Sequence, residues 1–324
     1  MNVPSSCEAA FDRGGPFWHL YTDGEKMELI FSCPADYVFG ITLLGLCAAA
    51  FPGCRILTFA LMSNHLHIIM AGPEADIRAF FALFRDRLGR CLSRQCRFCR
   101  MENFQASLFR IPDLRALRNE IVYVNRNGYV VHPECTPFSY WWSAGVFFFS
   151  PVARLLPARP FGSLTLRDRR AMCHTREAEL PDGYRVLMDF CPDGITQAGP
   201  LLLADSFCAI GEAERYFRDA HQYCRQVNRD LEAYSEVARR VGDRIFLTDD
   251  ELYGAVSALC AREYGTSVPA LLPAAAKPEI ARRMHFDYNA SNKQIQRMLK
   301  LAPGQVAELF PAPQPDSFLK KARI

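Results

Sequence analysis

The segment from Arg55 to Met70 constrains the fold most. It is rich in Ile, Leu and Phe and is interrupted only by Ser63-Asn64. A dense apolar run cut by two turn-forming residues is best interpreted as two successive strands. The chain is therefore expected to contain a sheet in its N-terminal half.

Helical and strand patterns alternate around this segment. Trp18–Thr22 and Met27–Ser32 are predicted to be short strands. Three stretches predict helices: one that begins at Pro34 and is closed by Pro52-Gly53, a second over Ala75–Arg94, and a third over Leu114–Asn127 that stops at Gly128. This order predicts an α+β domain that ends near Ser150.

The length of 324 residues suits roughly two domains of about 100–200 residues each. After the first domain, residues 151–211 are expected to form a connector or a wrapping segment. Residues 212–310 are expected to be mainly helical, with long helical patterns over Glu212–Arg240 and Asp249–Phe310, and residues 311–324 to form an extended tail.

Cysteine usage and apolar patterning indicate the compartment. The 13 cysteines have no disulfide framework, no leader pattern opens the chain, and the longest apolar stretch, Val38–Phe51, is too short to span a membrane. A reducing cytoplasm is expected. Cys91, Cys96 and Cys99 have zinc-like spacing but lack a nearby fourth ligand, so whether they bind anything is left open.

Positive charge is concentrated in one block. Residues 85–126 contain ten arginines and four acidic residues, although the whole chain carries only +3. Such a block is typical of a surface that binds a polyanion such as nucleic acid. A charged helix face that only contacts solvent explains it equally well.

His65 and His67 are the sharpest chemical feature. Alternate residues of a strand project from the same face, so the two imidazoles can converge on one divalent ion. Two packed or solvent-facing histidines are the alternative interpretation.

Tyr123 and Asn127 form the second feature. They are four residues apart on the third predicted helix and therefore share a face. Tyrosine is a covalent nucleophile, and an amide oxygen can complete a metal's coordination. The alternatives are a core aromatic at Tyr123 and a helix-end residue at Asn127, and Tyr129 is a rival nucleophile.

Residues 277–310 read as a helix-turn-helix. Glu279–Tyr288 predicts one helix, Ser291–Gln294 is a capping box that begins the next, and Gly304–Phe310 predicts a third. Its six basic residues outnumber its three acidic residues, Glu279, Asp287 and Glu308, which fits a module that contacts duplex or hairpin DNA. A plain three-helix packing unit is the alternative.

The ordered combination of Met62–Met70, Trp18–Thr22, Leu117–Val131 and Pro137–Ser143 resembles the one-tyrosine HUH transposases, and within them the REP-associated tyrosine transposases. The resemblance covers roughly residues 17–145. Ser63 stands where that family commonly has Pro before Asn-His, and Gly128 stands where Pro usually follows Asn.

The resemblance implies a ferredoxin-like antiparallel sheet with helices on one face, usually in a dimer. It implies that His65, His67 and Asn127 hold Mg²⁺ or Mn²⁺ while Tyr123 attacks a phosphate of single-stranded or hairpin DNA. The expected product is a 5′-phosphotyrosine link that is later reversed in strand transfer, and no ATP-binding motif is needed or present.

The expected activity is therefore that of a transposase-like nuclease and strand transferase in the cytoplasm, associated with the nucleoid. The alternative is a DNA-binding regulator of the same fold that has lost catalysis. The basic side chains expected to contact DNA are Arg85, Arg87, Arg90, Arg94, Arg118, Arg126, Lys293, Arg297 and Lys300.

Overall fold

The computed structural model describes residues 6–97, 99–131, 135–136, 138–173, 182–190, 197–229, 231–243, 247 and 249–310. The chain divides into two compact units, Met1–Asp243 and Arg244–Ile324. The division falls after Asp243 rather than near residues 150 and 211, so the segment after residue 150 belongs to the first unit. Among the described residues, no helix has the length and apolar character that a membrane crossing requires.

The first unit is built on a four-stranded sheet of β1 (Phe17–Thr22), β2 (Arg55–Leu61), β3 (Leu66–Ala71) and β4 (Ala106–Ile111). The strand order is β2-β3-β1-β4, and every neighbouring pair is antiparallel. The two strands expected between Arg55 and Met70 are confirmed as β2 and β3. The edge strand β4 was not anticipated, because its half-exposed sequence lacks a clear alternation.

The strand expected at Met27–Ser32 is absent. A short 3-10 turn, Gly24–Lys26, is followed by irregular chain. The backbone N–H groups of Ile30 and Phe31 both donate to the carbonyl of Ser63, at 2.8 and 2.9 Å. This segment therefore bonds to the β2–β3 turn instead of extending the sheet.

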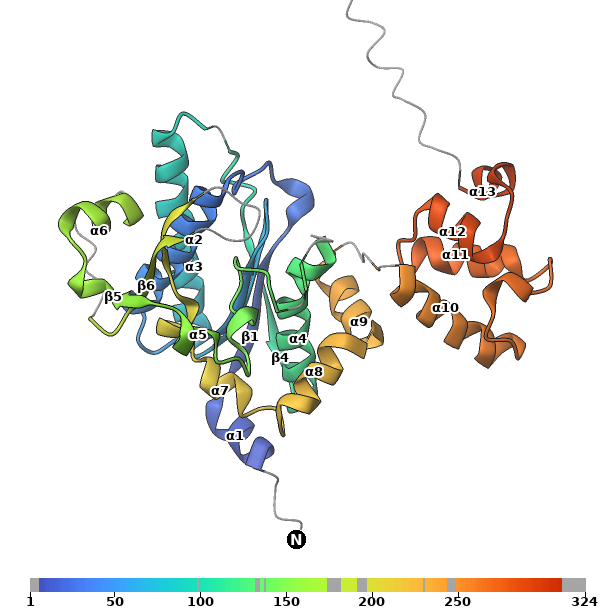
Figure 1. Ribbon diagram of the computed structural model, residues 1–324, viewed down its shortest axis with the longest axis horizontal. Helices are drawn as coiled ribbons and strands as arrows, with labels where there is room; N and C mark the ends of the chain where they lie inside the picture. The colour runs from blue at the N-terminus through green and yellow to red at the C-terminus, as the bar shows by residue number, and fades with distance from the viewer. Residues whose placement is uncertain are drawn as a thin grey trace, which may run out of the picture. The chain divides into compact units, whose positions relative to one another are not determined.

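Helices cover both faces of the sheet (Figure 1). Helices α2 (Pro34–Ala50) and α3 (Glu74–Arg94) pack together on one face. A Cβ at Gly40 of α2 would lie only 2.9 Å from the Leu61 side chain, so the helix and β2 approach closely there. Helix α4 (Leu114–Val131) packs on the other face against β2 and β3. The expectation of helices on one face is therefore wrong.

Helix α4 continues through Gly128, which was expected to end it. A Cβ at Gly128 would lie 2.0 Å from Cγ of Tyr140, whose ring is buried against the helix. Glycine is present there because the Tyr140 ring needs the space, not because the helix turns.

The remainder of the first unit wraps this core. Helix α1 (Ser6–Gly14) precedes β1, and a second antiparallel sheet packs against α2 through β7. The long helix expected over Glu212–Arg240 is broken into three pieces, of which α8 and α9 pack against α4. The elements of this part are α5 (Val152–Leu155), β5 (Ala158–Pro160), α6 (Leu166–Cys173), β6 (Arg185–Phe190), β7 (Gly199–Leu202), α7 (Ile210–Glu214), α8 (Ala220–Arg229) and α9 (Leu231–Val241).

The second unit consists of α10 (Asp249–Tyr264), α11 (Lys277–Phe286), α12 (Asn292–Leu299) and α13 (Pro303–Leu309). The capping box expected at Ser291 is confirmed, because its side chain accepts from Gln294 N while the Gln294 side chain accepts from Ser291 N. Lys300, with φ 53°, ends α12 in the left-handed region. Aliphatic side chains from α11, α12 and α13 form the core, among them Ile280, Ile295 and Val306.

Candidate active site on the α4 face of the sheet

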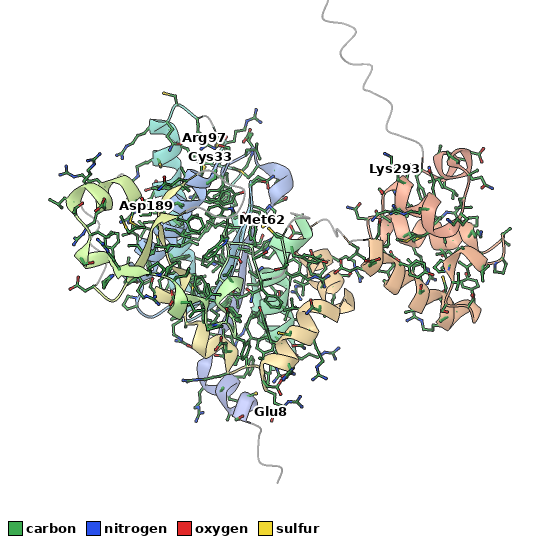
Figure 2. The ribbon with its side chains drawn as sticks, in the orientation of Figure 1. Glu8, Cys33, Met62, Arg97, Asp189 and Lys293 are labelled. Carbon is green, nitrogen blue, oxygen red and sulfur yellow. The ribbon has the colours of Figure 1, made fainter. Side chains whose placement is uncertain are left out.

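The two histidines of the sequence motif lie at the beginning of β3. His67 pairs with Tyr21 of β1, and strand alternation turns His67 toward α4. His65 immediately precedes the strand, in a turn where Met62 N donates to His65 O at 2.9 Å; Met62 is labelled in Figure 2. The imidazole centroids of His65 and His67 are 5.1 Å apart. The structure therefore brings the two rings together, as the motif predicted.

Asp243, just after α9, completes a cluster with these histidines. Its Oδ2 lies 3.0 Å from Nε2 of His67 and also accepts a hydrogen bond from the Tyr123 hydroxyl. One ligand atom from each of His65, His67 and Asp243 lies within 4.8 Å of the others. Within the described ranges this is the only group of three or more His, Cys, Asp or Glu residues placed to hold a metal ion.

The spacing within the cluster suits a divalent cation. Nε2 of His67 is buried and lies 3.0 Å from Oδ2 of Asp243. Two ligand atoms about 2.1 Å from one octahedral ion and at right angles to each other are about 3 Å apart. Two imidazole nitrogens and a carboxylate oxygen are also a donor set that divalent ions accept.

The protonation states match this role. Burial, together with the charge of His67, lowers the pKa of His65 to about 4. Burial opposes ionisation of Asp243, but His67 and His65 outweigh it and hold the pKa of that carboxyl well below its usual range. At neutral pH His65 is therefore neutral and Asp243 is charged, as ligands must be.

Tyr123 is buried at the centre of this face. Its ring centroid is 5.4 Å from that of His67 and 5.0 Å from that of Tyr234 on α9. Burial, reinforced by the charge of Asp243, raises the pKa of the Tyr123 phenol well above its usual value. The phenol is therefore protonated and donates to Asp243.

Asn127 lies one turn beyond Tyr123 and is also buried. Its Oδ1 accepts from the Tyr234 hydroxyl at 3.5 Å. Tyr129 lies on α4 rather than beyond its end, and its ring is 5.7 Å from the Arg126 guanidinium. The Asn127 side chain also hydrogen-bonds the Tyr123 phenol, which acts to lower the pKa of that phenol against the larger effect of burial. Asp243 is a carboxylate in the cluster that the sequence did not lead us to expect.

A second layer of polar groups supports His67. Its Nδ1 is 3.1 Å from Nε2 of His19 on β1, and Nδ1 of His19 is 2.8 Å from Oε2 of Glu120 on α4. The other carboxylate oxygen of Glu120 accepts from the Arg240 guanidinium. His19, His67 and Glu120 are all fully buried. Burial, with His67 and Arg240 nearby, holds the pKa of His19 well below its usual value.

The arginines of α3 lie away from this site. Arg85, Arg87, Arg90 and Arg94 belong to the helix that packs with α2 on the opposite face of the sheet from α4 (Figure 1). In the sequence these arginines lie between the histidine strand and the tyrosine helix, but in the fold they do not lie between those two elements. Three of them, with Ser93 and Cys99, instead line a separate surface hollow of about 570 Å³.

The α4 arginines are engaged within the first unit. Arg118 donates to the carbonyl of Tyr216. Arg126 is fully buried, with its guanidinium 5.1 Å from the Tyr234 ring centroid, so the expectation that it contacts DNA from the surface is wrong for this structure. In the second unit Lys293 and Lys300 are exposed, while Arg297 pairs with Asp249.

Sequence reasoning missed Asp243, Glu120 and the role of His19. Nothing in the sequence around Asp243 marks it as a site residue, because a single Asp after a helix is common. Glu120 is one acidic residue within a block of arginines and does not stand out either. His19 lay within a segment of the family resemblance, yet nothing in the sequence paired it with His67. Searches of protein-family models, curated proteins and solved structures find no match for this chain.

Proposed function

We propose that this chain nicks and rejoins single-stranded DNA, with Tyr123 as the nucleophile and a Mg²⁺ or Mn²⁺ ion held by His65, His67 and Asp243. One observation carries the proposal. Asp243 Oδ2 accepts a hydrogen bond from the Tyr123 hydroxyl and lies 3.0 Å from His67 Nε2. A single oxygen atom therefore contacts both the proposed nucleophile and a proposed metal ligand.

The topology supports the same proposal. The element order β1-α2-β2-β3-α3-β4 with strand order β2-β3-β1-β4 is typical of a ferredoxin-like sheet. The histidine strand β3 is central in that sheet, and α4 follows β4 onto the histidine face. This is the arrangement that the resemblance to one-tyrosine HUH transposases implies for its histidine and tyrosine motifs.

The reaction uses groups already in contact. The Tyr123 oxygen attacks a backbone phosphorus, a tyrosine–phosphate bond forms and the bond to the 3′ oxygen breaks. Asp243 already accepts the Tyr123 hydrogen bond and is therefore the first acceptor of its proton, while the departing 3′ oxygen gains one proton. A bound divalent ion offsets the charge on the phosphate. Attack by a free 3′-hydroxyl reverses these steps and rejoins a strand.

Substrate access requires a local movement. Tyr123 is fully buried, and Tyr234 and Asp243 lie against it. A DNA strand therefore reaches the phenol only after the end of α9 shifts. We further propose that the second unit contacts the duplex stem of a hairpin through Lys293 and Lys300, and that the chain works as a dimer.

The direct test is covalent capture. A pool of hairpin oligonucleotides with randomised single-stranded flanks is labelled at the 3′ end and incubated with the full chain and Mn²⁺. A 5′-phosphotyrosine link attaches the labelled fragment to the protein, which denaturing electrophoresis detects. The matched control is Tyr129→Phe, which removes the rival phenol of the same helix.

We expect the wild type and Tyr129→Phe to capture label and Tyr123→Phe to capture none while still binding the pool. Capture by Tyr123→Phe, or its loss in Tyr129→Phe alone, contradicts the assignment of the nucleophile. Binding without capture by the wild type, at every Mn²⁺ concentration, favours a DNA-binding regulator that has lost catalysis.

A further inference from the structure

A series of contacts, buried except at its Arg240 end, leads from α9 to Nδ1 of His67, the ring nitrogen opposite the one that faces Asp243. It runs from the Arg240 guanidinium to Glu120, from Glu120 to His19, and from His19 to His67. Both carboxylate oxygens of Glu120 are engaged, one by Arg240 and one by His19. No other polar side chain has to be invoked to link these four residues.

In each contact of this series, chemistry decides which of the two atoms carries the hydrogen. A carboxylate only accepts, so Nδ1 of His19 carries a hydrogen toward Glu120. Arg240 already compensates the Glu120 charge, and a second cation on the buried His19 ring would lack a counter-charge beside that guanidinium. His19 is therefore neutral, and its Nε2 offers only a lone pair.

The next hydrogen follows from the first. The 3.1 Å contact between His19 Nε2 and His67 Nδ1 needs one hydrogen, which must come from His67 Nδ1. Nε2 of His67 then has a lone pair on the side of Asp243. Asp243 Oδ2, 3.0 Å from that nitrogen, is also an acceptor, so the two atoms face each other as a pair that needs a cation beside it.

We infer that Glu120 and His19 are positioning residues that fix the tautomer of His67, so that its Nε2 binds the metal ion. The inference rests on the metal site of the proposed function but not on DNA cleavage. It assigns a purpose to the buried side chains of Glu120 and His19 and to the half-buried Arg240, none of which the nicking reaction itself uses. Residues behind metal ligands commonly act in this way.

The substitution Glu120→Gln tests the direction in which the hydrogen bonds of this series are donated. Arg240 can only donate, so the amide oxygen introduced at position 120 must face Arg240 and the amide NH₂ must face His19. His19 Nδ1 then becomes an acceptor, its Nε2 donates to His67, and Nε2 of His67 acquires the hydrogen. One nearly isosteric change therefore reverses every hydrogen in the series.

The readouts are Mn²⁺ affinity by calorimetry and the imidazole tautomers by nitrogen NMR on the histidine-labelled full chain without added metal, in which no bound ion decides the tautomer. We expect hydrogens on Nδ1 of His19 and His67 in the wild type. In Glu120→Gln we expect them on Nε2, with Mn²⁺ affinity about 10–100-fold lower. The double variant Glu120→Gln with Arg240→Met frees the amide to rotate, and affinity is expected to recover toward the wild-type value.

Thr58→Val is the matched control. It removes another buried hydrogen bond between this sheet face and α4, the one from Thr58 to Asn125, without touching the series of contacts. Unchanged tautomers or unchanged affinity in Glu120→Gln would overturn the inference, as would a double variant no tighter than the single one, or a wild type that does not bind Mn²⁺. Mn²⁺ binding with the expected tautomers but without DNA capture would refute the proposed reaction and leave this inference standing.

Discussion

The two faces of the four-stranded sheet differ in chemistry although they share the same strands. Side chains on the α2 face, such as Phe59, Leu61 and Ile68, are buried and apolar. The α4 face instead buries His19, His67 and Glu120. Burying polar groups costs free energy unless each finds a partner, so a protein retains such a face for what it does rather than for stability. This contrast is the reason that we propose the α4 face as the functional one.

The largest expected difference between the faces is in activity. His67→Asn removes a proposed metal ligand and is expected to lower nicking about a thousandfold, because a bound ion would supply several kcal/mol of transition-state stabilisation. Ile68→Ala, one residue away on the other face, is expected to lower the free energy of unfolding by about 2–5 kcal/mol. Nicking per folded molecule, from activity and circular dichroism together, should stay unchanged in Ile68→Ala. Equal losses of nicking in the two variants would contradict the assignment of function to the α4 face alone.

The identity of the third ligand gives the next effect. Asp243→Asn is expected to weaken Mn²⁺ binding at least about 100-fold, above the effect usual for residues behind ligands. Asn127→Ala is expected to change it less than about threefold, because the Asn127 side chain is engaged by the Tyr234 and Tyr123 hydroxyls. Titration calorimetry measures both. A larger loss of Mn²⁺ affinity in Asn127→Ala than in Asp243→Asn would favour the Asn127 amide, which the sequence predicted as the third ligand.

Acid is expected to destabilise the polar face selectively. In the metal-free protein the pKa of His65 falls to about 4 from an ordinary value of 6.5, so the unfolded chain binds the proton first. Stability should therefore fall as pH drops from about 6.5 toward 4, by at most about 3 kcal/mol for this group. The lowered pKa of His19 acts in the same direction, and that of Asp243 extends the loss to lower pH.

Thermal melts in EDTA between pH 7.5 and 4.5 measure this effect. His65→Gln, which cannot take up the proton, should show a flatter dependence on pH. If stability fell with pH as steeply in this variant as in the wild type, groups other than His65 would be responsible for the effect.

The smallest effect concerns how closely α4 is packed. Gly128→Ala is expected to cost about 1–3 kcal/mol, because the new methyl group collides with Tyr140. Gly254→Ala, in α10 of the second unit, meets nothing within 4 Å and should stabilise its helix by about 0.5–1 kcal/mol. Denaturant unfolding gives both values. A stabilising Gly128→Ala would show that the Tyr140 ring moves aside freely.

Local patterns predicted much of this molecule. The apolar run around Ser63-Asn64 gave both strands, and helical spacing gave α2, α3 and the beginning of α4. The capping box at Ser291 placed the beginning of α12 correctly. The errors occur where a distant group intervenes: at Gly128 the Tyr140 ring takes the space, and at Ile30 and Phe31 the Ser63 carbonyl takes the hydrogen bonds.

By itself, the sequence determined which side chains share a face, because residue spacing along a strand or a helix fixes direction locally. It therefore paired His65 with His67 and placed Tyr123 on a helix. The tertiary structure alone decided that Asp243, 120 residues after Tyr123, reaches both of these elements, and that the α3 arginines lie across the sheet from them. Contacts between distant elements depend on how layers pack, and no residue spacing within one element encodes that choice.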